Sequence, residues 1–364
     1  MRTIILYLIT LLFSVSSLAQ DQFFVHTATA ATISADASYI DHPDLNGNPG
    51  AQILVAHNWN PPGSGGVYNE FKTGVFYSGS EAKWGVYNEA GTAMIENSSY
   101  NVYIGDGTDV FLHIADAAAV GSLASYSVLD HPSLNNNPTA LITLTTYFNP
   151  NGVRNDEVYG VWYDDASFRW IIYAESLSDI PLDSAFFVGI EGSHTASAKH
   201  VATAGNISGN YTVITHPLLD GDPDARFVYT HNWGISGTSA NVIHDFKTGA
   251  WYTGTNWAIY NEDLSAMSVD VEFDLKIYDA ALAAPDEIIE GLSFYPNPTH
   301  DIVTISSVSE ITKVTVHNLL GQEVMTKLGD SNTLQLNLSN QQSGIYFARV
   351  EAEGGVQTIK LIKR

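Results

Sequence analysis

Hydrophobic and polar residues alternate along short segments through most of the chain. Runs rich in Val, Ile, Tyr, Trp and Thr, such as 51–59 and 225–233, are separated by clusters of Gly, Pro, Asn and Asp. A two-residue period bounded by turn residues predicts β-strands, and no segment carries a sustained helical stripe. The Ala-rich stretches after His26, His113 and His200 leave room for one short helix each. We therefore predict an all-β protein built of sandwiches or barrels.

This strand pattern occurs three times in the same order. The copies begin at His26, His113 and His200, which are 87 residues apart, and each contains a His-Pro turn block, an alternating segment, a Gly-aromatic strand and a Trp strand. A unit of this length can bury its own core. We predict three tandem β-sandwich or barrel-like repeat modules, at residues 20–106, 107–192 and 193–280.

The first 19 residues have the three-part organisation of a secretory signal peptide. Arg2 supplies the positive charge, residues 4–15 are almost entirely apolar, and Ser17-Leu18-Ala19 fits a cleavage site. The alternative is a membrane anchor, but the apolar run is shorter than the roughly 20 residues that a span needs. We predict cleavage before Gln20 and no transmembrane segment in the mature chain.

Acidic residues dominate the repeat region. The chain has a net charge of −24 at pH 7; residues 20–289 hold 32 Asp and Glu against 8 Lys and Arg, and residues 290–364 hold 7 against 6. A field of this sign repels nucleic acid and anionic lipid but tolerates neutral sugars. The alternative is that the acidic residues serve only to keep the protein soluble. The chain has no cysteine, which excludes disulfides, thiolate metal sites and cysteine nucleophiles.

Several motifs near the C-terminus stand in a fixed order: a Tyr-Pro-Asn-Pro start, a middle segment with a central glycine, a Ser-Gly-x-Tyr strand and a basic end. Over residues 292–364 they resemble the type A C-terminal sorting domain of the Bacteroidetes type IX secretion system. The matching residues are Tyr295, Pro296, Asn297, Pro298, Gly321, Gly344, Tyr346 and Lys360.

The resemblance implies a seven-stranded immunoglobulin-like sandwich that the outer-membrane translocon recognises and a surface sortase usually removes. The protein would then be released, or attached to lipopolysaccharide at the outer-membrane surface. The alternative is a β-sandwich with no sorting role. Residues 281–291, which are small-residue-rich and then acidic, form the predicted linker and a candidate processing site.

Aromatic positions that differ between the repeats are the candidates for ligand binding. His-Asn-Trp occurs in repeats 1 and 3, but repeat 2 has Thr-Tyr-Phe there, and a recurring Asn becomes Ala174. An aromatic ring beside a few polar groups suits a sugar. The alternative is an aromatic that anchors a strand end. The candidate residues are His57, Asn58, Trp59, Asn88, His231, Asn232, Trp233 and Asn261.

Residues present in all three copies favour structural roles, since large aromatics bury extensive apolar area. A histidine in a turn more often bonds backbone than metal, and a catalytic acid would need to occur only once. We expect structural roles for Trp84, Trp170, Trp257, Tyr77, Tyr163, Tyr252, His42, His131, His216 and the three unit-start histidines, and a structural or binding role for Glu89, Glu175 and Glu262.

An acidic loop in repeat 3 is the one metal candidate. Asp220, Asp222 and Asp224 offer oxygens to a hard cation such as Ca²⁺. The equivalent loops of the other repeats keep oxygens without charge, so a solvated turn is the simpler interpretation. We predict no cofactor, with calcium as the possible exception.

Common catalytic motifs, including G-x-S-x-G and H-E-x-x-H, are absent from the sequence. The repeats resemble uncharacterised tandem modules of secreted bacterial proteins. We predict a secreted, non-enzymatic carbohydrate-binding or adhesion protein that recognises a glycan or another surface component. Two alternatives stay open: a polysaccharide hydrolase, since paired carboxylates need only a suitable separation, and a structural matrix protein without a small ligand.

Overall fold

The chain forms two compact units, residues 1–283 and 284–364. A computed structural model describes residues 22–120, 124–192, 195–235, 239–279, 289–318, 323–352 and 355–364. The described residues form strands and turns without a helix, so the all-β prediction is confirmed. Within these ranges there is accordingly no helix long and apolar enough to cross a membrane. The predicted signal peptide lies outside the described residues.

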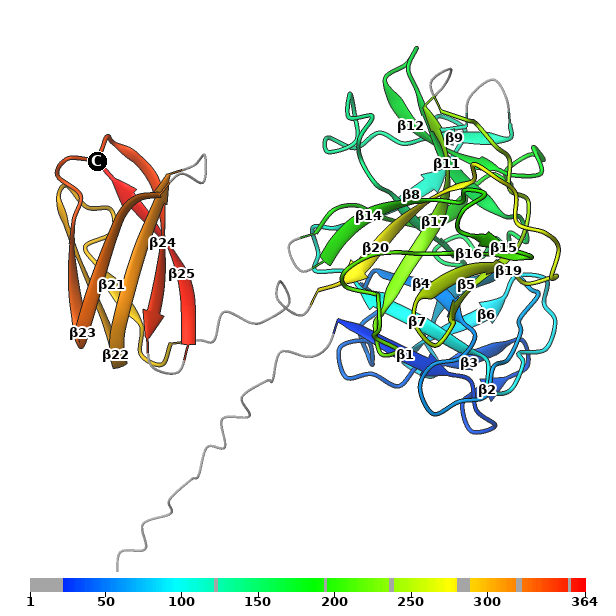
Figure 1. Cartoon of the computed structure of the whole chain (residues 1–364), viewed down its shortest axis with the longest axis horizontal. Helices are drawn as coiled ribbons and strands as arrows, with labels where there is room; N and C mark the ends of the chain where they lie inside the picture. Colours follow the sequence, from blue (N-terminus) through cyan, green and yellow to red (C-terminus); the bar gives the residue numbers. More distant parts are fainter. Residues whose placement is uncertain are drawn as a thin grey trace, which may run out of the picture. The chain divides into compact units, whose positions relative to one another are not determined.

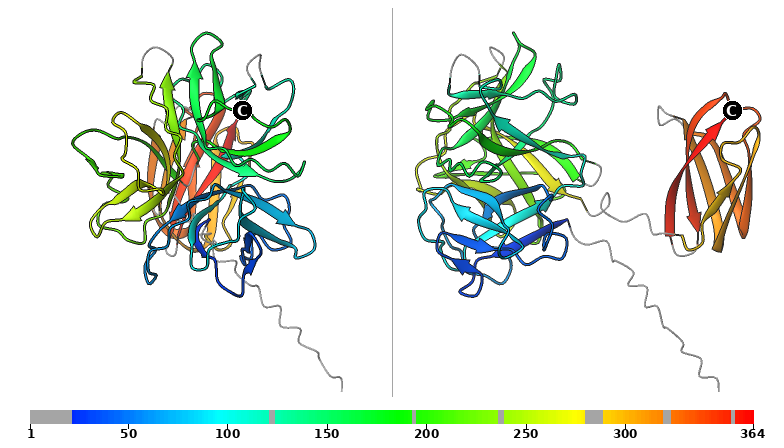
Figure 2. Two further views of the ribbon diagram at one scale, coloured as in Figure 1. Left: turned by 90° about the vertical axis from the view of Figure 1, so that its right-hand side faces the viewer. Right: turned by 180° about the vertical axis from the view of Figure 1, so that it is seen from behind.

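Three sheets make up the repeat unit, and each takes strands from two repeats (Figures 1 and 2). Sheet A has the order β1 (Phe23–Thr27), β7 (Ser99–Ile104), β4 (Ile53–Asn58), β18 (Thr248–Tyr252), β19 (Trp257–Asn261), β16 (Tyr211–Val213), β15 (Ile207–Ser208). Sheet B has the order β2 (Ile33–Ser34), β3 (Ala37–Tyr39), β6 (Lys83–Asn88), β5 (Thr73–Ser78), β10 (Thr143–Tyr147), β13 (Ser184–Gly189), β8 (Val110–Ala115). Sheet C has the order β14 (Thr195–Val201), β20 (Glu272–Tyr278), β17 (Phe227–Ile235), β11 (Tyr159–Asp164), β12 (Arg169–Ala174), β9 (Tyr126–Val128).

The place where two repeats meet within a sheet is called a joint here. Each joint is a parallel pair of strands: β4 with β18 at the 1–3 joint, β10 with β5 at the 1–2 joint and β17 with β11 at the 2–3 joint. The other pairings of these three sheets are antiparallel. The predicted repeat boundaries therefore do not coincide with sheet boundaries, and the three repeats interlock in a ring.

The recurring tryptophans lie in the core. Trp84, Trp170 and Trp257 are at most 1% exposed, and each indole N–H donates to a backbone carbonyl at 2.8 Å, from Asn48, Asn137 and Asp222. Tyr163 is also buried, while Tyr77 and Tyr252 pack against the core. These contacts agree with the structural roles expected for them.

The recurring histidines tie turns and strands together. The Nε2 atoms of His26, His113 and His200 lie 2.7–2.8 Å from the hydroxyls of Ser38, Ser127 and Thr212. In the His-Pro blocks, Nδ1 of His42, His131 and His216 accepts a backbone N–H two residues on. The expected short helices are wrong: the described residues of the Ala-rich stretches form turns, because side chains of Thr32, Asp116 and Asn206 accept local backbone N–H groups.

The C-terminal unit has five strands among its described residues: β21 (Ser293–Tyr295), β22 (Ile302–Asn318), β23 (Glu323–Asn337), β24 (Gly344–Ala352) and β25 (Gly355–Lys363). The order is β21-β22-β24-β25, with β23 on β22. The resemblance implied seven strands. The described residues form five, of which β22 and β23 are long and change their pairing register between Ser306 and Ile311.

Asn297 connects the Tyr-Pro-Asn-Pro turn, which begins the sorting motif, to the last strand by hydrogen bonds. Its amide donates to the Lys360 carbonyl at 2.8 Å and accepts the Ile362 N–H at 2.8 Å. Pro296 and Pro298 flank it. Tyr346 is buried and its hydroxyl donates to the Gln342 carbonyl.

The other sorting residues are exposed or lie outside the described ranges. Tyr295, Gly344 and the Lys360 side chain are exposed, and Gly321 falls outside the described residues. Most of the predicted linker also lies outside them, whereas Ile289, at its C-terminal side, packs in the core of the C-terminal unit.

Candidate binding site

Two joints carry an open cleft lined by tryptophans. At the 1–3 joint, Trp59 after β4 meets Trp251 of β18 edge-to-face, with ring centroids 6.1 Å apart. Tyr68, Tyr211, Tyr260 and Asn210 complete a cleft of about 160 Å³. Both indoles are partly exposed, unlike the core tryptophans.

The equivalent cleft at the 2–3 joint is larger. Trp233 of β17 and Trp162 of β11 again meet edge-to-face, at 5.7 Å and 88°. The cleft of about 430 Å³ is predominantly apolar, and Asp164 and Ser125 lie in its wall. Its lining includes the exposed side chains of Leu177 and Ile243.

At the 1–2 joint the corresponding aromatics are covered. Phe76 and Phe148 stand where the other joints have tryptophan, and each packs against Tyr87. Arg154 places its guanidinium 5.2 Å from the Tyr87 ring centroid and 5.9 Å from that of Phe148, and it pairs with Asp36 at 2.5 Å. The guanidinium therefore covers the aromatic rings of this joint.

Behind each open cleft, a buried histidine bonds a glutamate of the neighbouring repeat. Nδ1 of His57 contacts Oε1 of Glu262, and Nδ1 of His231 contacts Oε1 of Glu175. The Tyr260 and Tyr173 hydroxyls donate to the same carboxylates at 2.9 Å and 2.7 Å. All of these side chains are nearly fully buried.

The second oxygen of each recurring glutamate accepts a backbone N–H across the joint. Oε2 of Glu262, Glu175 and Glu89 accepts from Asn69 at 3.2 Å, His244 at 3.0 Å and Asn155 at 2.8 Å. At the 1–2 joint Thr146 replaces the histidine. Burial raises the pKa of Glu89, and the hydrogen bonds it receives lower it in part. Through these hydrogen bonds across the joints, the three glutamates connect neighbouring repeats of the ring.

The predicted asparagines are also internal. Asn58 donates to Asn101 and Asn232 donates to Asp274, both at 2.9 Å. Asn88 and Asn261 donate to backbone carbonyls of the loops that follow them. All four are at most 1% exposed. Of the predicted binding residues, Trp59 and Trp233 line the two clefts, whereas these four asparagines do not.

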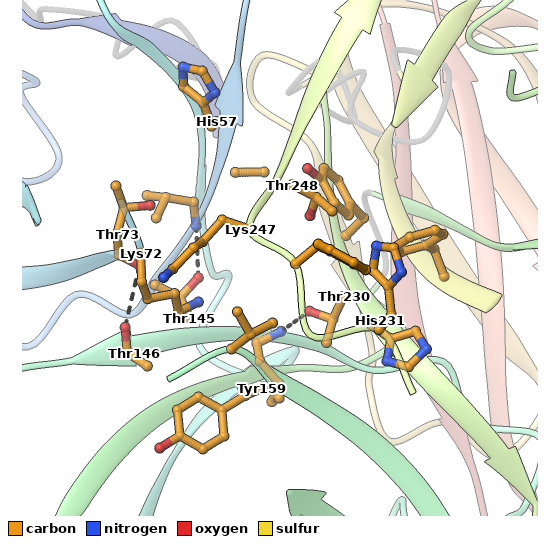
Figure 3. A pocket seen from close by; sticks show the side chains of 18 of the residues that line it. His57, Lys72, Thr73, Thr145, Thr146, Tyr159, Thr230, His231, Lys247 and Thr248 are labelled. Atoms are coloured by element: carbon orange, nitrogen blue, oxygen red, sulfur yellow. Dashed lines mark hydrogen bonds between the residues drawn. The ribbon is translucent and has the colours of Figure 1, made fainter. Parts of the chain in front are cut away.

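A separate cavity lies between the three central strands β4, β10 and β17 (Figure 3). It measures about 90 Å³, and His57, His231, Lys72 and Lys247 are among its lining residues. Burial lowers the pKa of Lys72; the charge of Glu89 opposes this shift and that of Lys247 adds to it. This polar cavity at the centre of an acidic unit was not predicted.

The acidic loop forms a turn. Asp220 accepts the His216 N–H and an Asn256 amide, and Asp222 accepts the Asp224 N–H. Among the described residues no three His, Asp or Glu side chains are grouped to hold a metal. Calcium at this loop stays an untested prediction.

Sequence reasoning missed the partners of the two cleft tryptophans. Trp162 and Trp251 occupy one position of the Gly-aromatic strand, where repeat 1 has Phe76. This position varies between repeats, as positions 59, 148 and 233 do. That variation could have identified Trp162 and Trp251 from the sequence. Lys72 and Lys247 likewise share a Phe-Lys-Thr-Gly motif that repeat 2 lacks.

Comparison with known families accounts for both units. A family model described as "Domain of unknown function (DUF7452)" matches residues 10–104, 74–176 and 160–277. The chain belongs to this family. A second model, described as "Secretion system C-terminal sorting domain", matches residues 293–364. The predicted sorting domain and tandem repeats are thereby confirmed.

Similarity to solved structures is remote. PorZ, described as an essential surface component of the type-IX secretion system of Porphyromonas gingivalis, matches at 11% identity and a TM-score of 0.17, over 84% of this chain and 46% of that chain. This chain thus spans less than half of PorZ. The BSP domain of a biofilm associated protein matches at 8% identity and a TM-score of 0.17, over 94% of this chain and 80% of that chain. No curated protein matches.

The sorting domain gives the destination of the protein. Its presence indicates recognition by the type IX secretion machinery. The protein is therefore secreted to the extracellular space or the cell surface, as predicted.

Proposed function

We propose that the repeat unit is a non-enzymatic binding module that recognises an extracellular glycan through the two tryptophan clefts. The observation that carries the proposal is the pair of partly exposed, edge-to-face tryptophans at each of two equivalent joints. Sugar rings present apolar C–H faces that stack on aromatic rings, while a few polar groups orient them.

Polar groups in the walls support a sugar over a purely apolar ligand. Asp164 and Ser125 line one cleft and Asn210 lines the other. These groups can accept or donate hydrogen bonds to hydroxyls without adding positive charge. Two clefts on one rigid unit also allow bivalent attachment, which raises the strength of weak binding by about 10²–10⁴.

The test is retention of the secreted protein on a panel of glycans and insoluble polysaccharides, with and without Ca²⁺. We expect selective retention, and we expect the double variant Trp59→Ala and Trp233→Ala to lose it. Each indole contributes about 1–3 kcal/mol if stacking on a sugar is comparable to stacking on a base. The matched control is Phe148→Ala, at the equivalent position of the covered joint, which should retain binding.

A second variant separates lost binding from lost folding. Trp162→Ala with Trp251→Ala removes the other wall of both clefts, and circular dichroism checks the fold of each protein. Folded variants that bind as the parent does would contradict the proposal. Release of reducing ends from the retained polysaccharide would instead favour the hydrolase alternative, and retention on no glycan would favour a matrix protein.

A further inference from the structure

Two lysines stand apart from the other basic residues of the repeat region. Eight Lys and Arg occur between residues 20 and 289. Five of them pair with a carboxylate, and Arg226 donates to the Phe23 carbonyl. The five are Lys83, Arg154, Arg169, Lys199 and Lys276. In the described part of the chain, the ammonium groups of Lys72 and Lys247 have neither an ion pair nor a hydrogen bond. Acid is abundant in this region, so the lack of a partner is specific to their position.

That position is the central cavity. Lys72 and Lys247 occupy the same place in repeats 1 and 3, and both line the cavity between β4, β10 and β17 (Figure 3). Repeat 2 contributes Val158 there. Two like charges beside one cavity repel each other, and burial removes part of the water that would screen them. A negative group between them would relieve both costs.

Two residues that line this cavity have a buried polar atom with no partner among the described residues. His57 and His231 line it, are 5% exposed, and leave Nε2 without a hydrogen-bond partner among the described residues. Buried polar atoms usually have partners. The volume of about 90 Å³ has room for a few waters or one small group, and excludes a polymer chain.

We propose that this cavity binds one small oxyanion of the phosphate or sulfate class between the ammonium groups of Lys72 and Lys247. The ion could arrive free in solution or as the terminal ester of a larger ligand, and both present the same tetrahedral oxygens. The charges of Glu89 and Asp156 also act on Lys72, and the small volume of the cavity favours a small ion. This site is distinct from the tryptophan clefts.

The test is calorimetric titration of the secreted protein with inorganic phosphate and inorganic sulfate. We expect saturable binding of one ion per chain, weakened at least tenfold by Lys72→Gln and by Lys247→Gln. Lys199→Gln, which removes a lysine paired with Glu272 elsewhere, is the matched control and should bind normally. Methyl phosphate and methyl sulfate distinguish the two sources: binding of the esters indicates a terminal group, and binding of the inorganic ions alone indicates a free ion.

A thermal measurement guards against misfolded variants. Without anion, Lys72→Gln should melt at or above the temperature of the parent, because it removes a charge whose desolvation outweighs its attraction to Glu89. Phosphate should raise the melting temperature of the parent and of the Trp59→Ala and Trp233→Ala variant, but not of Lys72→Gln. No saturable binding of either ion by the parent, or binding by Lys72→Gln and Lys247→Gln equal to that of the parent, would overturn the proposal.

Discussion

The 1–2 joint and the two open joints share a backbone arrangement but differ in the side chains that face the cleft. All three have a parallel strand pair and a buried glutamate that accepts a backbone N–H across the joint. Only the 1–3 and 2–3 joints have paired tryptophans and a histidine behind them; the 1–2 joint has Phe76, Phe148, Arg154 and Thr146. The ring closes in either case, so its stability does not require the tryptophans at the clefts. The paired tryptophans at the other two joints are therefore free to serve the binding role proposed above.

The largest expected effect comes from what all three repeats share. Burial lowers the pKa of His26, His113 and His200 to about 4, whereas an unfolded histidine titrates near 6.5. Between pH 6.5 and 4 the unfolded chain binds more protons, so stability falls as the pH falls through this window. Each histidine should cost about 3 kcal/mol by pH 4.

Urea unfolding at pH 7, 5.5 and 4 measures this effect. Asp274, whose pKa burial raises to about 6, works in the opposite direction and reduces the total. A variant with glutamine at all three histidines should show a flatter dependence. A free energy of unfolding that is constant from pH 6.5 to 4 in the parent would refute the assignment.

Removing the buried glutamate should lower the free energy of unfolding by different amounts at the three joints. Glu262→Ala or Glu175→Ala leaves a buried histidine and a backbone N–H unpartnered, at a cost of about 3–5 kcal/mol. Glu89→Ala, with Thr146 in place of histidine, should cost about 1–3 kcal/mol. Glu89→Gln serves as the control and should cost less than Glu89→Ala, since the amide oxygen can still accept the Asn155 N–H. Equal losses in urea unfolding at all three joints would show that the histidines add nothing.

The smallest change in stability is expected at the covered joint. Arg154→Ala removes cation–π contacts and a surface ion pair, which together contribute about 1 kcal/mol. Combining Arg154→Ile with Phe76→Trp and Phe148→Trp copies the 2–3 joint, where Ile243 takes the equivalent place. The number of glycan sites measured by calorimetry should rise from two to three. Unchanged stoichiometry in a folded graft would mean that the tryptophans are insufficient for binding.

Local pattern predicted the strands, the repeats and the buried tryptophans, because alternation and recurrence record which side chains face a core. It could not predict the exchange of strands between repeats, since a strand alternates identically whichever neighbour it pairs with. His57 and Glu262 were each singled out, but nothing local joins residues 205 positions apart. The position of Asn88 and Asn261 varies between repeats, as that of Trp59 does, yet both asparagines are buried. Variation alone therefore does not distinguish a surface binding residue from a residue that stabilises a loop.

The seam of the 1–3 joint has a consequence for the order of folding. Asn58 pairs with Ala250, so sheet A is complete only when the last repeat meets the first. Closing a loop of this length carries an entropic cost that precedes any gain from the contacts. The C-terminal unit is continuous in sequence, and its contact between the first turn and the last strand, from Asn297 to Lys360, closes a much shorter loop. The sorting domain can therefore reach its final form while the ring is still open.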